Sequence, residues 1–309
     1  MQRYAYLWIS PAEGTYINNA ITSTKYYISN KQENIHGLDF IKNVDNYYLY
    51  ENQNSLPIAY YMKDNIIDLN QKPFEMQNDF LSKLDTRSSN EQYLYNVLTQ
   101  NPLVKCEKTI KYGEDWTGAY YEIEALEDTD IYLYSDYILS IFLDDKPIYE
   151  GYAINAYKKT GIINIKKIKK GEKIELSVRT KSDLIEIEPS VAQIYVVDYK
   201  KTDEVLQNSI NNNKFILNEV NNTGLTGNVD FKEDGYLVFS IPYDENWQIK
   251  VNGRIVKTES INKTFLATRL NKGVYDIEIK YNPPSSTYTG GGITIISILV
   301  IFVLIRKYN

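Results

Sequence analysis

The sequence contains little of the chemistry on which metal sites and nucleic-acid binding depend. Its 309 residues include one cysteine, Cys106, and one histidine, His36. A single cysteine cannot form a disulfide within the chain, and a structural zinc site of four cysteine and histidine ligands is excluded. Lysine and arginine number 34 against 40 aspartates and glutamates, and no long basic run occurs. We therefore expect no metal and no nucleic-acid partner.

Catalytic motifs are missing as well. His36 is the one candidate general base, no nucleophile elbow accompanies it, and we expect an ordinary solvent-exposed histidine. No glycine-rich phosphate loop is present, so we expect no cofactor. A glycosidase needs two carboxylates at its active site. Two carboxylates at alternate positions of a strand, however, simply indicate the face of the strand that is exposed to solvent. The sequence predicts no catalytic residue. The close carboxylate pairs are Glu122/Glu124, Asp144/Asp145 and Glu186/Glu188.

What the sequence does contain is a β-type pattern with an internal repeat. Tyrosine, which favours half-buried pleated surfaces, occurs 29 times. Both copies of the repeat have a tight hairpin, a Lys-Gly turn and an alternating strand, and Asn252-Gly253 is typical of a two-residue type I′ turn. The alternating strands align Ile174 with Ile277. We predict two tandem antiparallel β-sandwiches of jelly-roll or immunoglobulin-like form. The similar segments are 130–135, 141–148 and 168–178 in one copy and 235–240, 249–256 and 270–281 in the other.

The helical patterns lie outside the two repeats. Residues 74–84 follow Pro73, and residues 91–98 follow Asn90 as N-cap. A third pattern begins at Thr202, again as N-cap, and links the two sandwiches. The protein is therefore predicted to be mainly β, in four parts. These are a small α/β segment with short helices (1–100), the first β-sandwich (101–200), the linker helix with the second β-sandwich (201–284), and a transmembrane helix with a short tail (285–309).

The predicted transmembrane helix has limited length. No charged residue occurs in 281–305, but the densest apolar part, 293–305, is 13 residues long. Extending it to 288–305 gives 18 residues, or about 27 Å at ~1.5 Å per residue, close to the hydrocarbon thickness. Arg306 and Lys307 follow as anchors. We predict one C-terminal span in a lipid bilayer, with a buried core segment as the alternative; the flanking charges do not orient it.

One segment has the character of a binding site. Tyr243, Asp244 and Trp247 lie in a short connection between two predicted strands of the second sandwich. Aromatic rings beside a carboxylate can stack on a sugar and hydrogen-bond to it, which makes these residues candidate carbohydrate contacts. In the alternative interpretation the two aromatic rings pack into the sandwich core and Asp244 caps the turn.

At this segment the sequence resembles the C-terminal end of the YfhO family, a family of bacterial polytopic membrane proteins. The resemblance covers nearly the whole chain in order, and Asn246 replaces a glycine that usually precedes the tryptophan. The similar segments are 240–247, 251–254, 265–266, 270–273 and 277–284, with weaker ones at 24–29, 50–52, 56–57 and 73–78.

The resemblance implies a C-type glycosyltransferase of the cell envelope, which transfers a lipid-linked sugar to a cell-surface polymer such as lipoteichoic acid. It further implies a body outside the cell membrane, held by one C-terminal span beside a multi-span bundle. The catalytic carboxylate belongs to that bundle, which this sequence lacks, so none is assigned here and whether the chain is itself an enzyme stays open. The alternative is a free-standing, membrane-anchored carbohydrate-binding or cell-surface module without catalysis.

Overall fold

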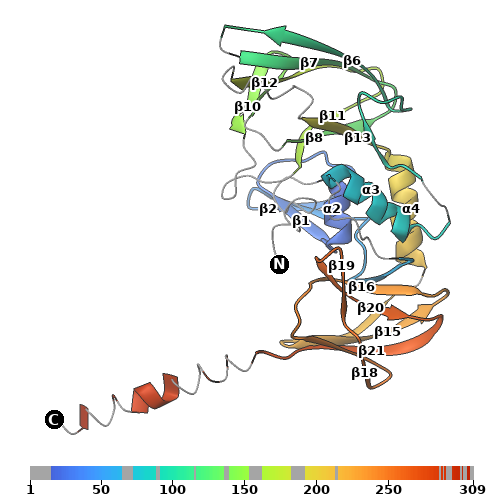
Figure 1. Cartoon of the computed structure of the whole chain (residues 1–309), viewed down its shortest axis with the longest axis vertical. Coiled ribbons are helices and arrows are strands. Elements are labelled where there is room, and N and C mark those ends of the chain that lie inside the picture. The colour runs from blue at the N-terminus through green and yellow to red at the C-terminus, as the bar shows by residue number, and fades with distance from the viewer. Residues whose placement is uncertain are drawn as a thin grey trace.

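The structure is a computed structural model that shows a mainly β chain built from antiparallel sheets. Two β-sandwiches lie at opposite ends of an elongated body, with the helices α3 and α4 between them (Figure 1). The residues that the structure describes are 15–64, 72–87, 91–114, 116–135, 139–152, 162–181, 192–212 and 215–284, with 287, 289, 294–299, 301, 305 and 306.

The first sandwich packs a five-stranded sheet, in the order β10-β9-β12-β7-β6, against a four-stranded sheet, in the order β11-β8-β13-β5. Alternate residues such as Ile174, Leu176 and Val178 enter its apolar core, as the period-two pattern requires. The strands are β5 (Leu94–Asn96), β6 (Val104–Tyr112), β7 (Trp116–Ala125), β8 (Thr129–Tyr134), β9 (Leu139–Leu143), β10 (Lys146–Tyr152), β11 (Ile163–Ile168), β12 (Lys173–Lys181) and β13 (Gln193–Val197).

The second sandwich repeats this plan. Its sheets have the orders β14-β15-β21-β17-β18 and β19-β20-β16-β4. Phe231, Leu237 and Ile277 are among the residues of its apolar core. The strands are β4 (Ala59–Met62), β14 (Ile216–Asn221), β15 (Gly224–Phe231), β16 (Gly235–Pro242), β17 (Trp247–Val251), β18 (Arg254–Val256), β19 (Glu259–Ile261), β20 (Phe265–Leu270) and β21 (Gly273–Tyr281).

The two hairpins of the repeat have the same turn geometry. Asn252 and Gly253 have φ values of 50° and 77°, and Asp144 and Asp145 have 50° and 61°. Positive φ at both central residues is what a type I′ turn requires. In each copy the first turn residue also exchanges two hydrogen bonds with the neighbouring strand: Asp144 with Glu175, and Asn252 with Asp276. The predicted turn is confirmed.

The register of the last strand differs by two residues from the sequence alignment. In the first sandwich Leu143 pairs with Leu176, and in the second Val251 pairs with Ile277. Ile277 therefore corresponds to Leu176 and not to Ile174. The alignment fails because a strand pattern has a period of two, so a shift of two residues leaves every side chain on its face.

The N-terminal segment contributes one strand to each sandwich. β4 pairs with β16 of the second sandwich, and β5 pairs with β13 of the first. In the second sandwich β4 is the neighbour of β16, and in the first sandwich β13 is the neighbour of β8. β4 and β13 therefore occupy equivalent positions in the two sheets. A helix follows each of these equivalent strands in the chain: α3 (Pro73–Leu84) after β4, and α4 (Tyr199–Asn211) after β13. The predicted α/β segment, residues 1–100, therefore contributes a strand to each sandwich.

Two of the helix predictions need correction. Helix 74–84 is confirmed as α3, but 91–98 is not a helix, because β5 runs through it and hydrogen-bonds to β13. The residue predicted as its N-cap, Asn90, lies outside the described residues. The linker helix α4 begins before Thr202, which is buried within it; Asp198 is the N-cap and accepts a hydrogen bond from the Lys201 amide.

A small third sheet lies beside the helices. It has the strand order β1-β3-β2, formed by β1 (Tyr26–Ser29), β3 (Tyr47–Asn52) and β2 (Leu38–Val44). The short helix α2 (Tyr16–Ile21) precedes it and buries Ile17 and Ile21 in the central core that also holds residues of α3 and α4.

The C-terminal residues lie away from the β body (Figure 1). Residues 294–299, 301, 305 and 306 are helical, and the side chains of Ile295, Ile296 and Ile298 are exposed by 60–62%. Within the part of the chain that the structure describes, no helix combines the length and apolarity that crossing a membrane requires. The remaining residues of the predicted span 288–305 lie outside the described ones, and the span stays a prediction.

Candidate functional site

The residues predicted as carbohydrate contacts occupy the connection between β16 and β17 and, for Trp247, the first position of β17. Tyr243 and Trp247 are partly buried and pack against the core of the second sandwich, and the Trp247 ring meets the Tyr281 ring edge-on at 5.0 Å. The Asp244 carboxylate accepts hydrogen bonds from the Asn246 amide (2.8 Å) and side chain (2.7 Å). In this geometry the aromatic rings support the core and Asp244 caps the turn. Contact with a sugar at these residues stays a prediction.

A different surface of the same sandwich forms a groove. It lies on the outward face of the five-stranded sheet and has a volume of about 250 Å³. The cross-strand pairs Asn228–Asp276 and Thr226–Glu278 place these side chains next to one another. The lining residues, which we call the polar groove, are Asn218, Thr226, Gly227, Asn228, Gly253, Asp276, Ile277 and Glu278.

A chain of hydrogen bonds fixes the side chains of the polar groove. The Asn218 amide nitrogen donates to Asn228 Oδ1 at 2.6 Å, and the Asn228 amide nitrogen donates to Asp276 Oδ1. Lys250 donates to both oxygens of Glu278, at 3.0 and 3.1 Å. Two carboxylates and one lysine give the groove and its margin a net negative charge, and its amides offer donors and acceptors in fixed positions.

The equivalent face of the first sandwich has different chemistry. There the row corresponding to Asn228, Asp276 and Asn252 consists of Glu122, Glu175 and Asp144. The second sandwich thus has the amides of Asn228 and Asn252 where the first has the carboxylates of Glu122 and Asp144. Among the described residues, no group of three histidine, cysteine, aspartate or glutamate side chains is arranged to hold a metal ion.

Of the three close carboxylate pairs in the sequence, one lies on the strand β7 and one in the turn between β9 and β10. Glu122 and Glu124 lie two residues apart on one strand, and each meets a different cross-strand neighbour: Glu175 faces Glu122, and Lys173 faces Glu124. Asp144 is in a turn and accepts a hydrogen bond from the Glu175 amide (2.9 Å). The third pair, Glu186/Glu188, lies outside the described residues.

His36, expected to be an ordinary exposed residue, is part of a structured polar cluster. Its Nε2 lies 2.7 Å from Asp203 Oδ2, and its ring stacks on Tyr199 with a centroid distance of 3.7 Å. Asn54 Nδ2 donates to the second oxygen of Asp203 at 2.7 Å, and Tyr16 donates to the same oxygen at 3.3 Å. The cluster joins α2 and the segments that flank the β1–β3–β2 sheet to the N-terminal part of α4.

The tyrosines of this cluster remain neutral. Burial raises the pKa of Tyr16 and Tyr199 far above the ordinary value, and the nearby carboxylates of Asp203 and Asp130 raise it further. Neutral phenols suit a packed junction, in which Tyr16 donates a hydrogen bond to Asp203 and the Tyr199 ring stacks on His36. We interpret the His36 cluster as a set of contacts that holds α2, the β1–β3–β2 sheet and α4 together.

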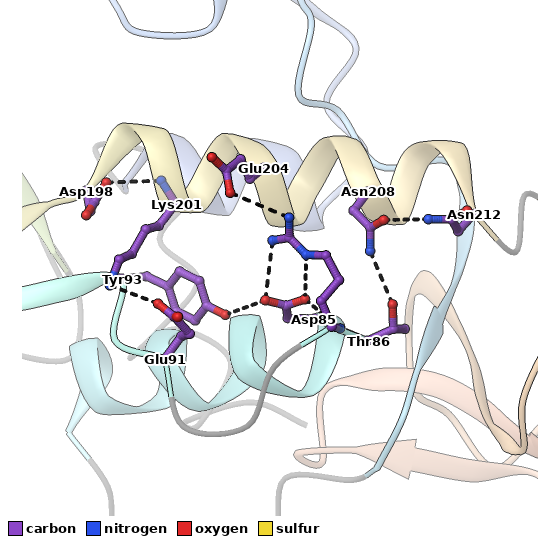
Figure 2. A network of polar contacts seen from close by, with 10 residues as sticks. Asp85, Thr86, Glu91, Tyr93, Asp198, Lys201, Glu204, Asn208 and Asn212 are labelled. Atoms are coloured by element: carbon purple, nitrogen blue, oxygen red, sulfur yellow. Dashed lines mark hydrogen bonds and ion pairs between the residues drawn. The ribbon is translucent and has the colours of Figure 1, made fainter.

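A second polar network joins α3 to α4 (Figure 2). Arg87, just after α3, donates to the buried Asp85 carboxylate at 3.1 and 3.4 Å and lies 3.5 Å from Glu204 on α4. Tyr93 also donates to Asp85, at 3.1 Å. Lys201, farther toward the start of α4, forms an ion pair with Glu91 at 2.8 Å. This network fixes the two helices that separate the sandwiches.

Together, the fold and the groove define a chain of two repeated antiparallel β-sandwiches, to both of which the N-terminal segment contributes a strand, with a groove lined by amide and carboxylate side chains on the second. Residues 2–294 match the family described as "Bacterial membrane protein YfhO". The match covers nearly the whole sequence, and the chain belongs to the YfhO family.

A curated relative supports the family assignment. The "Uncharacterized protein YfhO" of Bacillus subtilis (strain 168) is 28% identical over 181 residues, which make up 56% of this chain and 21% of the relative. The matched region thus spans about a fifth of the length of that curated relative.

Among solved structures the similarity is weak. The GH31 alpha-xylosidase from Xanthomonas citri aligns with a TM-score of 0.22 and 12% identity, covering 54% of this chain and 12% of the enzyme. A beta-glucosidase from Kluyveromyces marxianus aligns with a TM-score of 0.21 and 14% identity, covering 48% and 17%. At such TM-scores the alignments carry no conclusion about fold or function.

Sequence reasoning missed both the polar groove and the His36 cluster. The groove residues come from β14, β15, β21 and the β17–β18 turn; Gly253 belongs to the predicted turn, and no motif in the sequence indicates that the other residues form a groove. A weak signal in the sequence is that Asn and Asp occur at outward positions of strands in which apolar and polar residues alternate. From the sequence alone, such residues are interpreted as solvent-exposed.

Proposed function

We propose that this chain is the extracytoplasmic C-terminal portion of a YfhO-type membrane glycosyltransferase, and that its polar groove holds the acceptor glycan. In this proposal the chain itself has no catalytic residue, and a membrane bundle outside these 309 residues transfers the lipid-linked sugar. The observation that carries the proposal is a groove lined by hydrogen-bonded amide and carboxylate side chains on a chain of a membrane-protein family.

The chemistry of the groove suits a sugar. Carboxylates accept hydrogen bonds from hydroxyl groups, and the amides of Asn218 and Asn228 can both accept and donate. Because the side chains already hold one another in place, little conformational entropy is lost when a ligand binds. Asp276 and Glu278 repel phosphate, so on a lipoteichoic-acid-type polymer we expect contact with the sugar substituents and not with the phosphates.

The groove can be tested by binding. We would titrate the full chain with glucose, galactose and N-acetylglucosamine oligosaccharides and follow the ligand by saturation-transfer NMR. Asp276→Asn removes a charged acceptor, and we expect at least tenfold weaker binding. Glu175→Gln, at the equivalent position of the first sandwich, is the matched control and should bind as the unchanged chain does. Absence of binding to all three sugars, or equal loss in both variants, would overturn the proposal.

A separate experiment tests on which side of the membrane the β body lies. We propose that the β body lies outside the cell membrane, anchored by the C-terminal residues. Added protease should then digest the body in intact cells stripped of their wall, while inverted membrane vesicles should protect it. Digestion in inverted vesicles alone would place the body in the cytoplasm and refute this part of the proposal.

A second candidate is a free-standing, membrane-anchored carbohydrate-binding module that uses Tyr243, Asp244 and Trp247. Trp247 retains partial exposure beside the Tyr281 ring, which favours this candidate. If Trp247→Ala weakens sugar binding in a folded protein while Asp276→Asn does not, the binding surface is this connection and not the polar groove.

A further inference from the structure

The small β1–β3–β2 sheet exposes an unusual amount of apolar surface. Tyr26, Ile28, Val44 and Tyr47 have exposed fractions of 58, 66, 50 and 57%. Soluble surfaces carry single apolar side chains commonly, but contiguous apolar patches mark interaction sites. We call these four residues the apolar sheet face.

The strand register places the four side chains on one face. Ile28 pairs with Leu49, which pairs with Lys42; Tyr47 pairs with Val44. Tyr26 lies two residues from Ile28 on β1, and Tyr47 two residues from Leu49 on β3, so all point to the same side. On the opposite side the Tyr50 ring is 3% exposed and contacts the rings of Tyr27 and Phe40, of which Phe40 is 56% exposed.

The side-chain chemistry of the apolar sheet face fits the boundary between lipid and water. Tyrosines flank aliphatic side chains, as in the aromatic belts of membrane proteins, where a ring sits in the apolar layer and its hydroxyl reaches water. Lys25 neutralises Glu51 by an ion pair of 2.8 Å. Lys42, beside Leu49, has no ion-pair partner among the described residues and can extend its charge toward lipid phosphates.

Two further observations favour the bilayer as the occupant. The chain belongs to a family of bacterial membrane proteins. It also has a second exposed apolar element, since Ile295, Ile296 and Leu299 of the C-terminal helical residues are 59–62% exposed. In Figure 1 the β1–β3–β2 sheet lies on the side of the body toward which these C-terminal residues extend. One membrane surface can therefore meet both elements.

We infer that the apolar sheet face rests on the lipid bilayer and, with the C-terminal segment, gives the body a second point of membrane contact. A body held at two points has a fixed tilt, so its polar groove would stay at a constant height above the membrane. The lipid contact itself involves no residue of the groove, and a failure of sugar binding leaves it unaffected.

The test uses the full chain in vesicles of phosphatidylcholine and phosphatidylglycerol. With Cys106→Ser as background, Ile28→Cys is labelled with an environment-sensitive fluorophore. The matched control is Val274→Cys, on β21 of the second sandwich, where the native side chain is 72% exposed. We expect lipids with a spin label near the headgroup to quench the label at position 28 at least threefold more than at 274, and iodide to quench it less.

A variant separates the contribution of the protein from that of the fluorophore. Tyr26→Glu with Tyr47→Glu, in the Ile28→Cys background, should lower the lipid quenching to the level of position 274. Both tyrosines are more than half exposed, so the far-UV circular dichroism should not change. Equal iodide access at 28 and 274 would overturn the inference. Shielding from iodide without lipid quenching would also overturn it, because a protein partner or a second copy would then cover the face.

Discussion

His36 and Asp203 are 167 positions apart in the sequence, yet His36 Nε2 lies 2.7 Å from the Asp203 carboxylate. This contact connects the segment before β2 to Asp203, the fifth residue of α4. The carboxylate also accepts hydrogen bonds from Asn54 and Tyr16, so one side chain joins three separate parts of the chain.

Removal of this contact should lower stability. We predict that His36→Ala decreases the free energy of unfolding by about 1–3 kcal/mol, because a partly buried carboxylate loses a hydrogen bond and Tyr199 loses its stacked ring. Urea unfolding followed by circular dichroism measures the change. Lys200→Ala, an exposed position on the same helix, is the control, and a loss no larger than that of the control would show that the His36 cluster contributes nothing to stability.

Acid should weaken the junction between α3 and α4. Burial alone would raise the pKa of Asp85, but the hydrogen bonds from Arg87 outweigh it and the pKa lies below the ordinary value of about 3.9. Because the folded state favours the ionised form, this contribution is complete above about pH 4 and is lost as the pH falls through the folded-state pKa.

Asp85→Asn isolates that effect. We predict a loss of about 2 kcal/mol at pH 7, since the charged hydrogen bonds from Arg87 are removed, and a smaller loss at pH 3. Urea unfolding at the two pH values gives both numbers. A loss that stays the same at both pH values would mean that the ionised carboxylate is not the stabilising species.

The single thiol should react slowly. Burial, followed by the charge of Glu107, raises the pKa of Cys106 to about 11. At pH 8 the thiolate fraction is then roughly a thousandth, and we predict that iodoacetamide reacts more than about a hundredfold faster with the urea-unfolded chain. The folded rate should rise about tenfold per pH unit up to pH 10. A folded rate independent of pH would contradict the raised pKa.

β4 should be essential to the second sandwich and not to the first. Tyr61 is 2% exposed, meets the Phe231 ring edge-on at 5.2 Å and donates to the Asp234 carbonyl at 3.0 Å. We predict that Tyr61→Ala costs about 3–5 kcal/mol. Hydrogen exchange should speed up in β16 and β20 more than in β7 and β12. Tyr26→Ala, on an exposed side chain, is the control, and uniform loss of protection throughout the chain would show that the two sandwiches unfold together.

Local sequence patterns determined the elements whose signal is complete within a few residues. Asn252-Gly253 specified its turn because both positions accept positive φ, and Pro73 marked the start of α3. Alternation identified the paired sheets and the repeat. The polar stretch before β5 resembles the start of a helix. The strand itself was not recognised, because a three-residue strand has too few residues to show a period of two.

Only the tertiary structure decided which distant segments meet. β4 joins β16 through backbone hydrogen bonds between residues about 175 positions apart, and such bonds depend little on side-chain identity. The polar groove and the His36–Asp203 contact arise in the same way, since each collects side chains from elements that no local pattern connects. The sequence by itself determined a repeated β protein of the YfhO type. The long-range register of its strands determined where that protein has a groove and an exposed apolar sheet.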